Sequence, residues 1–249
     1  MMQFGAVTDI GMCRKINEDN YYVTAKGDFP YAIVADGMGG HKAGEIASMM
    51  VIDVIKNQLE NKLDKNHDYV ETGETIRQAF IAANSIIYKY SENHYKIMGM
   101  GTTATLAMIY EDKIITAHVG DSRAYMINDK EIKQLTKDHS YVQELVSMGK
   151  ITKEEAKHHP KKNFITRAIG AEETVKVDIG IKPYNGEKIL LCSDGLINFV
   201  EDEEIKDIMV NGDGSLQEKS EQLVQTANSR GGKDNITIIV LEKENRNEQ

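Results

Sequence analysis

Acidic residues in this chain repeatedly stand where an apolar run meets a turn. Asp36 closes the segment YAIVADGMGG, Asp194 closes KILLCSDGL, and Asp234 opens KDNITIIV, while Glu18 and Asp19 precede YYV. If these runs are neighbouring antiparallel strands, the end of one lies beside the start of the next, and the carboxylates gather at one sheet edge. Carboxylates that close repel one another, and a hard cation such as Mg²⁺ or Mn²⁺ relieves that repulsion. The pattern therefore predicts a metal-dependent enzyme that acts on phosphate.

Three motifs each allow both a structural and a functional interpretation. GDSR, at 120–123, is either a tight hairpin turn or the source of a further carboxylate, Asp121. RKINED, at 14–19, is either an exposed ion pair that stabilises the fold little, or it uses Arg14 to bind phosphate through two parallel hydrogen bonds. DGMGGH, at 36–41, is either a strand-to-helix turn or a glycine-rich segment that lets the backbone approach a ligand.

The order of the predicted elements sets the fold class. Strands are predicted at 2–9, 21–25, 31–35, 102–110, 113–119, 122–127, 175–182, 187–192 and 236–241. Helices are predicted at 43–60, 74–92 and 215–229, with shorter ones at 139–148, 153–157 and 201–209. Strands in clusters, interrupted by a helix pair, exclude a regular alternation of strand and helix. They predict an α+β fold with two antiparallel sheets packed together and helices outside.

Composition narrows the partners and the compartment. The 249 residues carry a net charge of −9 without a dense basic tract, which argues against nucleic acid as a partner. No apolar stretch approaches the roughly 20 residues of a membrane helix, and the first residues lack a secretory signal, so membrane insertion is not expected. Cys13 and Cys192 have no CxxC spacing, which favours a reducing cytoplasm.

The segment from about 140 to 167 differs from the rest of the chain. It is helix-like but short of apolar residues, and it contains the patch KHHPKKN. We expect a mobile insertion over the surface that can gate or select substrates. Its adjacent His158 and His159 lack metal-ligand spacing and are expected to be exposed.

Eight short motifs, taken in order, resemble those of the bacterial PPM/PP2C-type serine/threonine phosphatases. They are RKINED, DGMGGH, GTT (101–103), GDSR, DHS (138–140), RAIG (167–170), SDGL (193–196) and KDN (233–235). The resemblance covers nearly the whole chain. It implies one phosphatase domain over 1–243 with a flap at about 140–167, followed by a charged tail at 244–249. The implied architecture is a four-layer α-β-β-α sandwich of two central antiparallel sheets flanked by helices.

The resemblance also implies a centre of two cations, Mn²⁺ or Mg²⁺. Asp36 matches the aspartate that bridges both ions, and the carbonyl of Gly37 matches a ligand of one of them. Asp194 and Asp234 match ligands of the other ion.

Further positions match groups around those ions. Asp121 matches a ligand of a weaker third metal, and Asn198 stands where some relatives carry an acid that helps to hold it. Glu18 and Asp19 match acids that orient metal-bound waters, and Arg14 matches the phosphate-binding arginine. Animal relatives carry a candidate acid histidine where this chain has Met38, so the nearby His41 is the candidate proton donor here.

The implied activity is direct hydrolysis of phosphoserine and phosphothreonine in proteins by a water activated between two cations. The expected partners are phosphoproteins, including a transmembrane serine/threonine kinase whose action the enzyme reverses, and the chain is expected to be a monomer. Two other interpretations stay open: a phosphatase-like protein that binds phosphopeptides without hydrolysing them, and a nucleotide hydrolase with similar metals. The sequence lacks the lysine-containing phosphate loop that the second of these would need.

Overall fold

Two antiparallel sheets form the centre of the molecule. The computed structural model describes residues 2–39 and 43–244. The first sheet has the order β1 (Met2–Asp9), β11 (Ile236–Lys243), β10 (Lys188–Cys192), β7 (Arg123–Ile127) and β8 (Ile132–Gln134). The second has the order β2 (Asp19–Thr24), β3 (Tyr31–Met38), β5 (Ala104–Tyr110), β6 (Lys113–Val119) and β9 (Asp178–Pro183), with β4 (Gly101–Thr102) paired to the end of β3.

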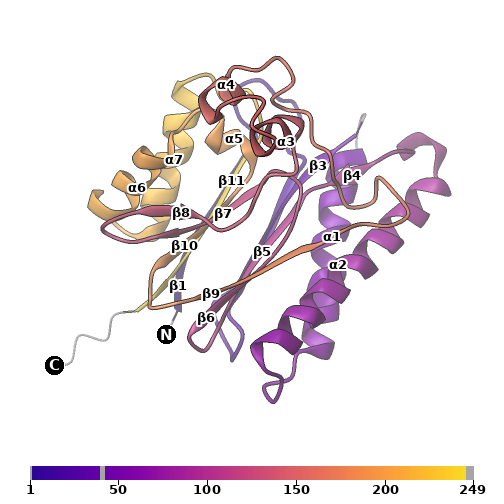
Figure 1. Cartoon of the computed structure of the whole chain (residues 1–249), viewed down its shortest axis with the longest axis horizontal. Helices are drawn as coiled ribbons and strands as arrows, with labels where there is room; N and C mark the ends of the chain where they lie inside the picture. Colours follow the sequence, from indigo (N-terminus) through magenta and orange to yellow (C-terminus); the bar gives the residue numbers. More distant parts are fainter. Residues whose placement is uncertain (1, 40–42, 245–249) are drawn as a thin grey trace.

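Helices cover the outer face of each sheet (Figure 1). The long helices α1 (Ala43–Lys62) and α2 (Tyr69–Glu92) pack on the second sheet, and η1 (Tyr95–Ile97) follows α2. The first sheet is covered by α5 (Asp194–Ile197), α6 (Asp202–Asn211) and α7 (Leu216–Ser229). The short helices α3 (Tyr141–Ser147) and α4 (Lys153–Lys157) lie at the end of the sandwich where α5 begins. The predicted α+β sandwich of four layers is thereby confirmed.

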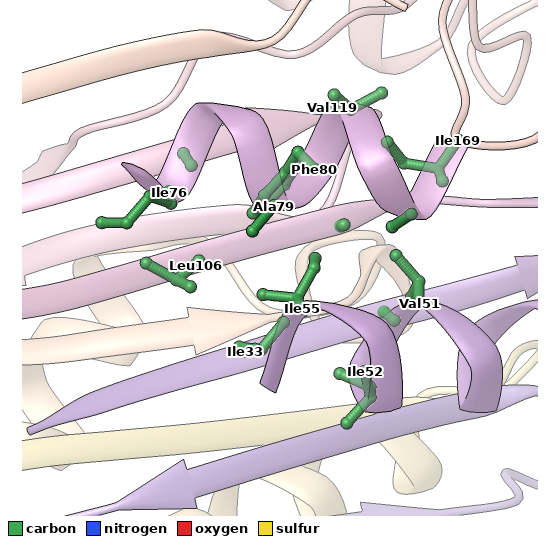
Figure 2. Packing of buried hydrophobic residues seen from close by; sticks show 14 of the residues in the cluster. Ile33, Val51, Ile52, Ile55, Ile76, Ala79, Phe80, Leu106, Val119 and Ile169 are labelled. Atoms are coloured by element: carbon green, nitrogen blue, oxygen red, sulfur yellow. The ribbon is translucent and has the colours of Figure 1, made fainter. Parts of the chain in front are cut away.

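The apolar strands are buried on both faces. In β3, Ile33 packs against the helices while its neighbours Ala32 and Val34 face the other sheet, because side chains alternate along a strand. Figure 2 shows Ile33 in one cluster with Ile55 of α1 and Phe80 of α2. Such double burial requires an uninterrupted apolar run, and the run ends at Asp36.

Several predicted boundaries are wrong, each for a local reason. Helix α2 begins five residues before the predicted start because Asp68 caps it: its Oδ1 accepts hydrogen bonds from the backbone N–H groups of Val70 (2.7 Å) and Glu71 (2.8 Å). The predicted strand 102–110 is two strands, β4 and β5, separated at Thr103. The predicted strand 175–182 begins only at Asp178, and the short elements β8 and α5 were not predicted.

A buried histidine on β6 makes stability dependent on pH. The His118 side chain is 2% exposed, and its Nδ1 lies 2.9 Å from the Thr105 hydroxyl. Because that hydroxyl donates its proton to the Ser122 carbonyl (2.9 Å), His118 Nδ1 must be the donor in their contact. Its Nε2 is buried with no partner among the described residues. Burial, reinforced by the neighbouring His139, lowers the pKa of His118 from 6.5 to about 3.

We expect the unfolding free energy to fall with acidity because of His118. The unfolded chain takes up a proton near pH 6.5 and the folded one does not, so stability is present above 6.5 and lost as pH falls toward 3. Between pH 6.5 and 5 this amounts to about 1.5 kcal/mol. Urea titrations at pH 6.5 and pH 5 should therefore show that wild type loses its advantage in unfolding free energy over His118→Asn by that amount as the pH falls. His158→Asn, at a side chain that is 80% exposed, is the matched control. An advantage that is the same at the two pH values would contradict this account.

Candidate active site

The six predicted acids all lie at one end of the sandwich. The register of β2 and β3 places Asp19 directly opposite Asp36. Glu18 precedes β2, and its carbonyl accepts from the Gly37 N–H at 3.1 Å. The end of β3 is packed tightly against α1, since a Cβ on Gly37 would lie 2.1 Å from the Gly44 carbonyl oxygen. Glycine at position 37 is therefore required for this close approach.

The other sheet contributes two acids to the same end. Asp194 begins α5 directly after β10, and Asp234 precedes β11, the antiparallel partner of β10. The two turns are in contact, because a Cβ on Gly195 would lie 2.0 Å from the Asn235 carbonyl oxygen. Ser193 joins the sheets, since its hydroxyl donates to Asp19 Oδ2 at 2.7 Å.

The GTT motif connects the remaining acid to this group. Thr103 donates its backbone N–H to the Asp36 carbonyl (2.8 Å), and its hydroxyl accepts from the Asp36 N–H (2.9 Å). The same hydroxyl lies 2.8 Å from the Ser122 hydroxyl, in the turn that carries Asp121. One threonine thus fixes the end of β3 relative to the turn between β6 and β7.

The carboxylates are close enough to disfavour one another's ionisation. Burial, followed by repulsion from Asp19, Asp194, Asp121 and Asp234, raises the pKa of Asp36 well above its usual value. Burial is also the main reason that the pKa rises to about 7 for Asp19, about 6 for Asp194 and about 8 for Asp121. Repulsion by a neighbouring aspartate adds to each rise. Such a cluster attracts cations.

Unsatisfied oxygen atoms mark where a cation fits. Glu18 Oε1, Asp19 Oδ1 and Asp194 Oδ1 are buried and have no hydrogen-bond partner among the described residues. A buried carboxylate oxygen without a partner is costly, and hard divalent ions are bound by oxygen. Over residues 2–39 and 43–244, no three acidic, histidine or cysteine side chains have the arrangement of a completed metal site. The carboxylate oxygens are the kind of ligand that Mn²⁺ and Mg²⁺ prefer. Some of these carboxylates are hydrogen-bonded to other side chains of the protein.

Arg14 is one of those protein groups. Its Nη2 donates to Asp234 Oδ2 at 2.8 Å, so the predicted phosphate ligand and a predicted metal ligand are paired with each other. The Arg14 side chain is 48% exposed and remains accessible from solvent. His41, the predicted proton donor, lies outside the described residues.

Comparison with known proteins settles the family. The family model described as Protein phosphatase 2C matches residues 14–237. The chain belongs to the protein phosphatase 2C family. It is 41% identical over 239 residues to the serine/threonine phosphatase stp of Listeria welshimeri, covering 95% of this chain and 94% of the relative.

Solved structures agree with this membership. The phosphatase superimposes on Stp1 of Staphylococcus aureus with a TM-score of 0.92 and 38% identity, covering 98% of this chain and 96% of Stp1. It also matches the catalytic domain of PstP in complex with two manganese ions, with a TM-score of 0.82, 34% identity and 97% coverage of both chains. The predicted resemblance is confirmed: the chain is a metal-dependent serine/threonine phosphatase, and its substrates are phosphoproteins. No helix among the described residues has the length and apolar character that crossing a bilayer requires.

A cavity beside the carboxylates brings in a residue of the phosphatase that the motifs did not reveal, Lys162. The volume of the cavity is about 660 Å³, and it extends from Asp121 and Asp194 between the segment 140–163 and the first turn of α6. Lys162 reaches into this region, where its Nζ donates to Asn198 Oδ1 (3.2 Å), and Asn198 Nδ2 in turn donates to Asp194 Oδ2 (3.1 Å). The basic patch KHHPKKN was visible in the sequence, but nothing there distinguished the lysine that reaches the site.

Proposed function

We propose that this phosphatase hydrolyses phosphoserine and phosphothreonine with two divalent cations, Mn²⁺ or Mg²⁺, held at the acidic end of the sandwich. The observation that carries the proposal is the set of buried, unsatisfied oxygens on Glu18, Asp19 and Asp194 around Asp36. The structure of a relative with two manganese ions supports the same count of ions.

Each acid has a proposed task. Asp36 and the Gly37 carbonyl would hold one ion, and Asp36 with Asp194 and Asp234 would hold the other. Asp121 would bind a weaker third ion. When bound, such ions lower the pKa of a water and neutralise charge on phosphate.

The remaining residues would orient water and substrate. Glu18 and Asp19 accept hydrogen bonds from water and orient it toward phosphorus. Arg14 donates to the phosphate oxygens once Asp234 turns to an ion, because the guanidinium already lies at this site. His41 is the proposed donor of a proton to the leaving alkoxide.

The segment 140–167 is the proposed flap, and the phosphatase domain would span 1–243. The flap helices α3 and α4 form one wall of the cavity beside the acids. The residues of a substrate peptide on either side of the phosphorylated one would therefore contact these helices. Lys162 adds a positive charge next to Asp194, on the side from which a phosphate would enter.

The proposed physiological role is reversal of a transmembrane serine/threonine kinase by a monomeric enzyme in the cytoplasm. Cys13 and Cys192 are both free, Cys13 exposed and Cys192 buried, which fits a reducing compartment. Co-purification of the kinase with an inactive variant, together with the chain's mass in solution, tests the partner and the oligomeric state.

Metal removal and substrate comparison test the activity. We expect phosphate release from phosphoserine and phosphothreonine peptides to cease after chelation and to return with Mn²⁺ or Mg²⁺. ATP should be turned over at least about 100-fold more slowly, because the sequence lacks the lysine-containing phosphate-loop motif. Calorimetric titration should find two tight Mn²⁺ sites. Peptide binding without phosphate release at saturating Mn²⁺ would instead identify a pseudophosphatase.

A further inference from the structure

Three consecutive residues, 138–140, join the turn that carries Asp121 to the flap. Asp138 accepts from Arg123 Nε (2.9 Å) and Nη2 (2.7 Å), so it holds the turn two residues after Asp121. His139 holds the residue before Asp121 at two points. Its backbone N–H donates to the Gly120 carbonyl (2.7 Å), and its Nδ1 accepts from the Gly120 N–H (3.0 Å). Hydrogen bonds therefore hold the turn in place on both sides of Asp121.

The same residues begin and end the flap. Ser140 caps helix α3, with its hydroxyl accepting from the Gln143 N–H at 3.3 Å. At the other end of the flap, the Thr166 N–H donates to the His139 carbonyl (2.7 Å), and Ser140 forms a bridge with Ile165. Both ends of the flap thus meet at His139.

Contacts at both ring nitrogens fix the orientation of the His139 ring. Because Nδ1 accepts from the Gly120 N–H, Nε2 carries the proton of the neutral ring and faces Asp178 Oδ2 at 3.1 Å. Arg167 Nη1 also lies 2.9 Å from Nε2, so both side chains hold this edge of the ring. The other oxygen of Asp178 accepts from Arg167 at 2.9 Å. The ring is 6% exposed and packs against the His118 ring in a tilted arrangement, with a centroid distance of 4.7 Å. It has no freedom to follow the flap without moving the Asp121 turn.

We infer that His139 is a positioning residue that couples the flap to the Asp121 carboxylate. A shift of the flap base moves the imidazole, and the imidazole moves Gly120 and hence Asp121. Ions bound near Asp121 would act back on the flap through the same ring. This inference rests on the proposed function only in taking Asp121 as part of the ion-binding end. The coupling itself follows from the contacts of His139.

Two substitutions separate the two nitrogens of the ring. In His139→Asn, the amide oxygen takes the place of Nδ1 and can accept from Gly120. In His139→Gln, the amide nitrogen takes the place of Nε2 and can donate to Asp178, but the Gly120 N–H loses its acceptor. A residue that only filled space would be damaged about equally by both changes.

Hydrogen exchange gives a readout that is independent of activity. We expect the Gly120 amide to stay protected in wild type and His139→Asn, and to exchange at least about tenfold faster in His139→Gln. Adding Mn²⁺ should slow exchange in α3 by about threefold or more in the first two proteins and leave His139→Gln unchanged. The kcat of His139→Asn should stay within about threefold of wild type, while that of His139→Gln should fall about tenfold with little change in KM.

The outcomes distinguish this coupling from the proposed reaction. Equal losses in both variants, in parallel with their melting temperatures, would overturn the coupling. So would flap exchange in wild type that does not respond to bound Mn²⁺. If wild type binds no Mn²⁺ and releases no phosphate, the proposed function fails, yet the Gly120 exchange rates still decide whether the ring holds the turn.

Discussion

Asp36→Asn is expected to reduce phosphate release from a phosphothreonine peptide by about a thousandfold or more, because it removes the central charge of the proposed ion-binding site. Four other aspartates act on the Asp36 carboxylate, so it lies at the centre of the acidic cluster, where we propose that it contacts both ions. An amide has nearly the same shape but carries no charge, and Mn²⁺ binding measured by calorimetry should weaken together with turnover.

Stability measurements separate this effect from misfolding. In chelator, Asp36→Asn should be at least as stable as wild type, since the substitution relieves burial of a charge and repulsion among the acids. Asp53→Asn, an exposed acid on α1, is the matched control and should retain wild-type turnover. Full activity in Asp36→Asn would refute the proposed centre, and unfolding of the variant would refute the repulsion argument.

Arg14→Gln should lower kcat/KM for phosphopeptides by about 100-fold, the value of a charge-assisted, two-pronged hydrogen bond to phosphate. The loss should appear mainly in KM if the guanidinium contacts phosphate equally in the bound substrate and at the transition state. Affinity for Mn²⁺ should move in the other direction. Asp234 is paired with Arg14 in the structure, and the substitution frees that carboxylate for an ion.

Opposite changes in metal affinity and turnover are a signature that general destabilisation does not produce. Lys15→Gln removes a neighbouring exposed charge and serves as the control. If Arg14→Gln instead weakens Mn²⁺ binding, Arg14 does not compete with an ion for Asp234 but keeps that carboxylate in place for the ion. Its proposed role in binding phosphate would then be contradicted.

The strand pattern predicted much of the architecture because burial leaves a direct mark on sequence. A strand covered on both faces must be apolar throughout, so Asp36 stands out near the end of β3 and Asp194 stands out just after β10. Boundaries were less accurate wherever one side chain decided them. The Asp68 cap makes α2 begin before the predicted residue. Strand β8 was missed for another reason, because it is too short to show an alternating pattern. Motif order alone indicated the family, since eight motifs in register rarely coincide.

The sequence alone determined the fold class, the family and the set of acids that can meet at one end of the sandwich, because alternation and strand ends follow from local residue order. Only the tertiary structure decided which partner each group has. Arg14 is bound to Asp234, Ser193 reaches Asp19, and His139 joins the flap to Gly120. The first two contacts join residues more than 170 positions apart, and all three depend on how the two sheets and their connecting turns pack, which no local pattern encodes.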